Sequence, residues 1–99
     1  MNSNKFTDID NLKNSLCCLR HDIDQIDNEI LTLLEKREDC VIEIGKIKRL
    51  ISKQPEYFVP EREKEIIDRV TSTYKGKFQL SEIKKIYNLI IENSRLLQK

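Results

Sequence analysis

Residues 16–51 read LCCLRHDIDQIDNEILTLLEKREDCVIEIGKIKRLI, and this stretch decides the fold. Its apolar residues recur at steps of three and four, and one charge, Arg37, interrupts the pattern. Such spacing places these side chains on one face of a long helix. We call this face the apolar seam; it comprises Leu16, Leu19, Ile23, Ile26, Ile30, Leu33, Cys40, Ile44, Ile47 and Ile51.

The length of this helix predicts a partner chain. At about 1.5 Å per residue, the helix would be roughly 54 Å long. A compact domain of this size has a radius of gyration of only about 13 Å. One copy of the chain cannot cover its own apolar seam, so we expect a partner to cover it. An unpaired charge at Arg37 would be costly there, and we expect an anionic group to meet it.

The composition excludes several classes of function. The 99 residues allow one domain, and 18 basic residues nearly balance 17 acidic ones, which argues against a nucleic-acid partner. The three cysteines and single histidine match no metal-binding spacing, so we expect no metal site. No stretch approaches the length of a membrane span, and the polar start MNSNKFTDID does not resemble a signal peptide. We therefore expect a cytoplasmic protein without a membrane partner.

The remaining chain predicts two shorter helices and no strand. The polar residues 1–11 suggest a flexible N-terminal extension ahead of a helical domain over residues 12–99. The long helix should end near Ser52, before a loop that contains Pro55 and Pro60. The fold class is therefore all-α, with one long and two shorter helices.

The ends of the two shorter helices have recognisable signals. Pro60 suits the first turn of the second helix, where Glu61 and Glu63 would face its positive end. Gly76 is expected to cap the C-terminus of that helix, and Ser81 to cap the N-terminus of the third.

Several polar residues lie where a helix would face its neighbours. Arg37 and Lys48 are eleven residues apart, on nearly the same face and about 16 Å from each other, so their long side chains could converge on a small anion. Gly45 lies between them and costs about 1 kcal/mol relative to alanine, which close packing or ligand approach would explain. The third helix ends its apolar face in Ser94 and Gln98. An ion pair inside the protein is the rival explanation for Arg37, and surface charge the rival for Lys48.

Two further features complete this set. Arg62 and Glu63 open the second helix beside the loop, where a solvated or paired arginine and a helix N-terminal acid are the simpler explanations. Arg20 lies about 25 Å along the long helix from Arg37, too far to serve the same small site within one chain. In an antiparallel dimer it could reach the partner's site. Together these residues indicate cations and neutral donors gathered around a small polyanion.

From Leu16 to Gln98 the chain resembles the all-helical, AroQ-type chorismate mutases. The matching segments are LRHDIDQIDNEILTLLEKR, VIEIGKIK, PEREKEII and LIIENSRLLQ. The resemblance implies an intertwined helical homodimer and an isomerase, which would convert chorismate to prephenate in phenylalanine and tyrosine biosynthesis by a Claisen rearrangement without a cofactor.

The same resemblance implies a role for each residue. Arg37 and Arg20 of the partner subunit would hold the two carboxylates of the substrate. Lys48 would contact a carboxylate and the ether oxygen whose bond breaks, and Gln98 would donate a second hydrogen bond to that oxygen. Glu63 would accept from the ring hydroxyl, Arg62 would support the site, and Ser94 would bind a carboxylate. At Val59 the family often has an aspartate, so this chain departs from the pattern there.

Two alternatives stay open. An isochorismate pyruvate-lyase has the same fold and uses paired cations and a lysine; Glu63 favours the mutase, whereas Val59 is compatible with the lyase. A non-catalytic helical dimerisation module would need only the apolar seam, and it leaves Arg37, Ser94 and Gln98 unexplained. Docking onto a larger enzyme of the pathway, as some small mutases do, is also open.

Overall fold

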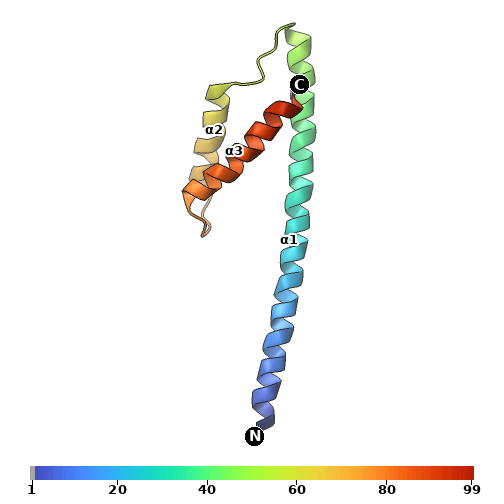
Figure 1. Cartoon of the computed structure of the whole chain (residues 1–99), viewed down its shortest axis with the longest axis vertical. Helices are drawn as coiled ribbons and strands as arrows, with labels where there is room; N and C mark the ends of the chain where they lie inside the picture. Colours follow the sequence, from blue (N-terminus) through green and yellow to red (C-terminus); the bar gives the residue numbers. More distant parts are fainter. Residues whose placement is uncertain (1) are drawn as a thin grey trace. The chain divides into compact units, whose positions relative to one another are not determined.

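The computed structural model describes the backbone of residues 2–99 and the side chains of residues 8–99. It contains three helices, α1 (Asn2–Ile51), α2 (Pro60–Thr73) and α3 (Leu80–Leu97), and no strand among the described residues (Figure 1). This confirms the predicted all-helical fold with one long and two shorter helices. Within the same residues, no helix is both long and apolar enough to cross a membrane.

The long helix ends at Ile51, as its sequence pattern predicted, but it begins earlier than expected. The backbone of residues 2–11 continues α1 toward the N-terminus. The predicted flexibility of residues 1–11 falls partly outside the described residues, and it stays a prediction. The chain divides into two compact units, residues 1–36 and residues 37–99, and α1 contributes to both.

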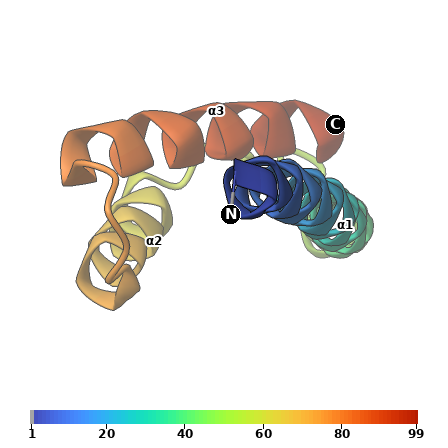
Figure 2. The ribbon, with the colours of Figure 1, turned by 90° about the horizontal axis from the view of Figure 1, so that it is seen from below.

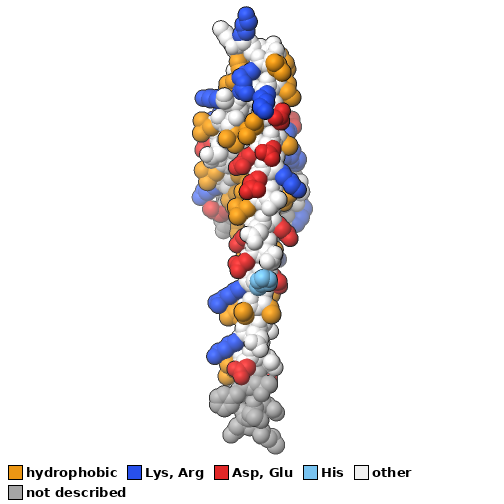
Figure 3. All heavy atoms as spheres, turned by 90° about the vertical axis from the view of Figure 1, so that its right-hand side faces the viewer, with side chains coloured by type: hydrophobic (Ala, Val, Ile, Leu, Met, Phe, Trp, Pro, Cys, Tyr) orange, Lys and Arg blue, Asp and Glu red, His pale blue; other side chains and the backbone are white. Residues whose placement is uncertain are grey.

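The first unit leaves its apolar seam exposed. Figure 3 shows one face of the molecule, on which apolar side chains of this unit lie among charged ones at the surface. Leucine and isoleucine side chains rarely stay exposed in such a continuous row unless something covers them. The exposed large apolar residues of this unit are Ile9, Leu12, Leu16, Leu19, Ile23, Ile26, Ile30, Leu31 and Leu33.

The second unit forms a small core from all three helices. α3 starts beside the end of α2 and runs back obliquely toward α1, and its C-terminal end lies against the last turns of α1 (Figures 1 and 2). Four side chains are buried, namely Val41, Ile66, Ile83 and Ile91. Because they come from α1, α2 and α3, their burial brings the polar residues beside them on each helix to one place.

α2 begins as its sequence predicted. Val59 is extended, with φ −120° and ψ 92°, as the residue before a proline should be, and Pro60 starts the helix. The N–H of Glu63 donates to the carbonyl of Val59 at 3.1 Å, which forms the first helical hydrogen bond. Glu61 and Glu63 lie in the first turn, where their negative charges interact favourably with the positive end of the helix dipole.

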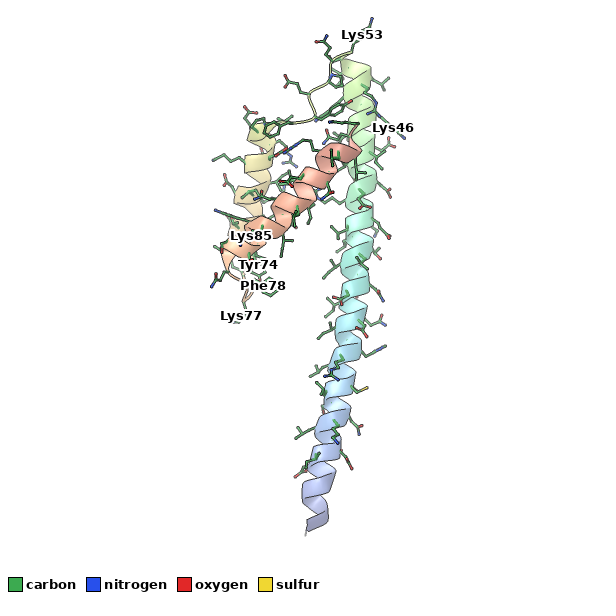
Figure 4. The ribbon with its side chains drawn as sticks, in the orientation of Figure 1. Lys46, Lys53, Tyr74, Lys77, Phe78 and Lys85 are labelled. Atoms are coloured by element: carbon green, nitrogen blue, oxygen red, sulfur yellow. The ribbon has the colours of Figure 1, made fainter. Side chains whose placement is uncertain are left out.

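The two caps predicted at Gly76 and Ser81 are wrong. α2 ends at Thr73 and is capped by the extended residue Tyr74, and Gly76 does not have a positive φ. Its small size matters instead, because a Cβ there would lie 2.7 Å from Cε2 of Tyr74. Tyr74 folds back over the turn, and its hydroxyl accepts from the N–H of Phe78 at 3.0 Å (Figure 4).

At the start of α3, Gln79 takes the place expected for Ser81. Gln79 is the extended N-cap, and no side chain caps this helix end. Its backbone carbonyl accepts the first helical hydrogen bonds, from Glu82 at 3.0 Å and from Ile83 at 3.2 Å. Ser81 therefore lies within the first turn, because Leu80 already has helical geometry.

Candidate functional site

The second unit contains a pocket of about 420 Å³, within the size range of small-molecule sites. α1, α2, α3 and the loop between α1 and α2 all contribute to its wall. The floor is apolar and the polar groups are mostly cationic. The lining residues are Arg37, Cys40, Val41, Ile44, Lys48, Tyr57, Val59, Arg62, Glu63, Ile66, Arg69, Ile91, Ser94, Arg95 and Gln98.

Arg37 reaches α3 through Ser94. Its Nη1 donates to the Ser94 Oγ at 2.5 Å, while that hydroxyl donates its own hydrogen to the carbonyl of Ile90 at 2.7 Å. The serine oxygen is thereby oriented as an acceptor for the guanidinium. Among the described residues Arg37 forms no ion pair, so the rival explanation of an internal salt bridge is not borne out there.

Lys48 reaches the same helix one turn later. Its Nζ donates to the Gln98 Oε1 at 2.7 Å. Since the amide oxygen accepts from lysine, the Nε2 group of Gln98 keeps its two N–H donors for another acceptor. Ser94 and Gln98 are about 6 Å apart along α3, compared with about 16 Å between Arg37 and Lys48 along α1. The two cations therefore converge toward the end of α3, as the sequence predicted.

Gly45 explains how α3 approaches α1 so closely. It is buried, and a Cβ at this position would lie 2.7 Å from the Cα and 2.8 Å from the carbonyl carbon of Gln98. The close packing predicted for this glycine is therefore against the backbone of Gln98. Arg49 donates to the carbonyl oxygen of Gln98, a cation at the negative end of α3.

Arg62 and Glu63 both line the pocket but have different partners. Arg62 is exposed and pairs with Glu65 three residues along α2. Glu63 is the one carboxylate among the lining residues, and Arg95 of α3 binds both of its oxygens. A hydrogen bond to this carboxylate raises the pKa of Arg95 above its usual value, so the guanidinium stays charged.

The family model described as "Chorismate mutase type II" matches residues 19–99, and thus nearly the whole chain. The chain belongs to the type II chorismate mutase family. The matched residues include α2, α3, the part of α1 from residue 19 onward and every polar residue of the pocket.

Known members of this family are similar over most of the chain. The chain is 35% identical over 82 residues to a chorismate mutase of Methanocaldococcus jannaschii, which covers 82% of this chain and 81% of that protein. It is 33% identical over 87 residues to the bifunctional chorismate mutase/prephenate dehydratase of Escherichia coli, which covers 87% of this chain. The chain spans about a fifth of that longer relative, 22% of its length.

A solved structure of the family has the same fold. The crystal structure of chorismate mutase from Helicobacter pylori in complex with prephenate superposes with a TM-score of 0.71 at 30% identity. The match covers 84% of this chain and 88% of that one.

The structure brings six of the seven sequence-predicted site residues to one pocket. They are Arg37, Lys48, Arg62, Glu63, Ser94 and Gln98. The seventh, Arg20, lies exposed on the first unit and is not among the residues that line this pocket. Its predicted role as a residue of the partner subunit stays a prediction.

Sequence reasoning missed Arg95. Its guanidinium lies 4.4 Å from the centroid of the Phe58 ring, in addition to its bonds with Glu63. It directly follows Ser94, so a change of about 100° around α3 separates the two side chains, and helical arithmetic assigned only Ser94 to the inner face. The loop and α2, which turn around that side of α3, place Arg95 inside the pocket. Tyr57 in the loop and Arg69 on α2 were also missed as lining residues, because their place in the pocket depends on how these segments pack against α1 and α3.

Proposed function

We propose that this chain is a chorismate mutase, an isomerase that converts chorismate to prephenate. The observation that carries this proposal is that Arg37 and Lys48 bind Ser94 and Gln98 inside a pocket lined by cations and apolar side chains. A pocket of this kind suits a small molecule with two negative charges. The family relationship supports the same substrate, since the Helicobacter pylori relative was crystallised with prephenate.

The reaction makes modest demands on the protein. The rearrangement occurs within one molecule and needs no nucleophile, general base or bound metal. The protein would accelerate the reaction by holding the substrate in its folded, reactive shape, and by fixed hydrogen-bond donors that face the oxygen on which negative charge develops. Arg37 would hold one substrate carboxylate, since its planar fork can donate two parallel hydrogen bonds. The hydroxyl of Ser94 would bind the same carboxylate by turning its one hydrogen from the Ile90 carbonyl toward the substrate.

Lys48 and Gln98 would share the ether oxygen. The ammonium donates to the Gln98 Oε1 at 2.7 Å, so the Nε2 of the same amide lies beside the lysine Nζ. Both groups could therefore donate to one acceptor without rearranging. Such preorganisation lowers the barrier, because no reorientation is needed when charge develops.

Glu63 would accept from the ring hydroxyl, with Arg62 supporting the site from the same turn of α2. Val59 lines the pocket next to them, where the family often has an aspartate. Val59 can keep a contact that the backbone amide makes at this position. A contact made by the aspartate carboxylate would be lost, and recognition of the hydroxyl would then be weaker.

A second copy of the chain would complete the site. The apolar seam of the first unit is exposed, and a second long helix with the same seam would cover it in an intertwined homodimer. Arg20 of the partner subunit would then hold the second substrate carboxylate. This proposal can be tested by complementation, because Arg20→Ala and Arg37→Ala damage opposite halves of a shared site.

When these two variants are unfolded together and refolded as a mixture, mixed dimers would have one intact site. About a quarter of the wild-type sites should return if the chains assort randomly. Refolding each variant alone is the control and should restore no activity. If the mixture stays as inactive as its parents, Arg20 does not act across a dimer.

The first test of the proposed function is the loss of chorismate absorbance with identification of the product. Prephenate formation that falls at least about 100-fold in Lys48→Ala and in Gln98→Ala would support the mutase. Release of pyruvate from isochorismate, without turnover of chorismate, would assign the chain to the lyase instead. No turnover of either substrate would leave the helical dimerisation module.

Two features of the cellular setting belong to the same proposal. We place the reaction in the cytoplasm, which fractionation of cells that express the tagged chain would test. Docking onto a larger enzyme of the pathway stays a prediction, which cross-linking of the tagged chain in the same cells would test.

A further inference from the structure

The pocket places one carboxylate among five cations. Arg37, Lys48, Arg62, Arg69 and Arg95 line it together with Glu63. An acid in this position would repel a doubly negative substrate unless its charge were balanced. The residue that balances it is therefore part of the site.

Arg95 is that residue. Its Nη2 donates to both oxygens of Glu63, to Oε1 at 2.7 Å and to Oε2 at 2.9 Å, and its Nε donates to Oε2 at 3.1 Å. The side chains of Arg95 and Glu63 are only 32% and 22% exposed. The other ion pairs of the described residues join neighbours on one helix and are more exposed, whereas this one joins α2 to α3.

A third element holds the pair in place. The guanidinium of Arg95 lies 4.4 Å from the centre of the Phe58 ring, in the loop that precedes α2. A cation over an aromatic face is held by the ring quadrupole, and the ring restricts where the guanidinium can move. Arg95 thus connects α3, α2 and the loop at the edge of the pocket.

The geometry also limits what Glu63 can do. A carboxylate offers about four lone-pair sites, and Arg95 occupies three of them. About one site remains to accept a hydrogen bond from a ligand. The acid is therefore held in one orientation, with capacity for a single hydroxyl.

We propose that Arg95 is a positioning residue for recognition of the ring hydroxyl of chorismate. It orients the Glu63 carboxylate toward that hydroxyl and cancels its charge, so that the two substrate carboxylates can bind nearby. This inference rests on the proposed chorismate mutase function and adds to it a residue that acts through Glu63.

A double-mutant cycle on the full chain tests this role. The variants are Arg95→Met, Glu63→Gln and the double variant, compared by kcat and KM for chorismate. Arg95→Met should lower kcat/KM about 10- to 100-fold, mainly by raising KM. In the Glu63→Gln background, where no charge remains to cancel, the same change should cost less than about threefold. Arg95→Lys should recover part of the loss, because lysine restores the charge without the fork.

Lys85→Met is the matched control. Lys85 lies in the first half of α3 and pairs with Glu82 at 3.1 Å on an exposed surface (Figure 4). Its loss removes one cation from the same helix and should leave kcat/KM within about twofold of wild type. An equal loss from Arg95→Met in both backgrounds would overturn the proposal, since Arg95 would then act independently of Glu63. Wild-type kinetics in Arg95→Met would overturn it as well.

A second readout does not depend on activity. Thermal or denaturant unfolding of the same four proteins measures the coupling between the two side chains. If the two substitutions change the free energy of unfolding non-additively, Arg95 is supported as the group that holds Glu63. Additive changes would overturn this role, whether or not chorismate is turned over. If the wild-type chain fails to turn over chorismate while the coupling is present, the proposed function fails and the positioning of Glu63 stands.

Discussion

Replacing Gly45 with alanine should separate stability from activity. The glycine is buried where the last turns of α1 meet the backbone of Gln98. A Cβ there would lie 2.7 Å from the Gln98 Cα and 2.8 Å from its carbonyl carbon. Ordinary carbon–carbon contact begins at about 3.5 Å, and the carbonyl oxygen of Gln98 would lie closer to the Cβ than either carbon. The end of α3 must therefore move away by at least about 0.8 Å. Backbone cannot rotate aside as a flexible side chain can.

The cost in stability should be small because two effects oppose each other. Overpacking costs about 1–3 kcal/mol. Alanine is about 1 kcal/mol better than glycine inside a helix. The free energy of unfolding should therefore fall by about 0–2 kcal/mol, which corresponds to a decrease in Tm of about 0–16 °C for a chain of this size.

The cost in activity should be larger. Gln98 is proposed to donate to the ether oxygen, and a misplacement of about 1 Å can cost about 100-fold in rate. For a shift of about 0.8 Å we expect kcat to fall about 30- to 100-fold. KM should change less, because the bond to that oxygen strengthens mainly in the transition state.

The assay is chorismate consumption at saturating substrate, together with circular dichroism and thermal unfolding at one fixed protein concentration. Lys46→Ala is the control, because it changes the adjacent residue on the exposed side of α1, where Lys46 pairs with Glu43 at 3.0 Å (Figure 4). Its kcat should stay within about twofold of wild type. A Gly45→Ala protein with wild-type kcat and a raised Tm would refute the reasoning, since α3 would then tolerate the extra methyl group.

Further expectations concern charge and pH. Arg37→Ala should lower mutase activity at least about 100-fold. In a non-catalytic helical dimer, the same substitution would only raise the melting temperature, because it removes a charge from the apolar seam. Ser94→Ala should lower kcat/KM about 10-fold through the loss of the hydroxyl that accepts from Arg37 at 2.5 Å, measured by initial rates. The wild-type rate should be flat through neutral pH because the Gln98 amide donates at any pH, whereas Gln98→Glu should gain rate on acidification; a wild-type rate that rises only in acid would contradict this role. The hydrogen bond to Glu63 raises the pKa of Arg95. The stability that comes from this ion pair is therefore fully present below the usual guanidinium pKa, and it is lost only as the pH rises through the raised pKa. Thermal unfolding followed from neutral to mildly basic pH should therefore show no loss from this pair.

The sequence alone determined the elements of the fold. The spacing of the apolar seam, the two prolines before α2 and the scarcity of glycine are local signals, and they located all three helices. It also determined that Arg37 and Lys48 share one face of α1, because their angles around the helix are fixed whatever packs on them. Ser94 and Gln98 followed from the same arithmetic on α3. Helix periodicity needs no tertiary information.

Only the tertiary structure decided which residues meet. The partner of Glu63 is Arg95, thirty-two residues along the chain, and its position depends on how α3 crosses α2 rather than on its own helix. Gly45 is understood only with the backbone of Gln98 beside it. The caps expected at Gly76 and Ser81 were overridden by the ring of Tyr74 and by the extended backbone of Gln79. Local propensity differs by a few tenths of a kcal/mol between neighbouring positions, and packing contacts outweigh such differences.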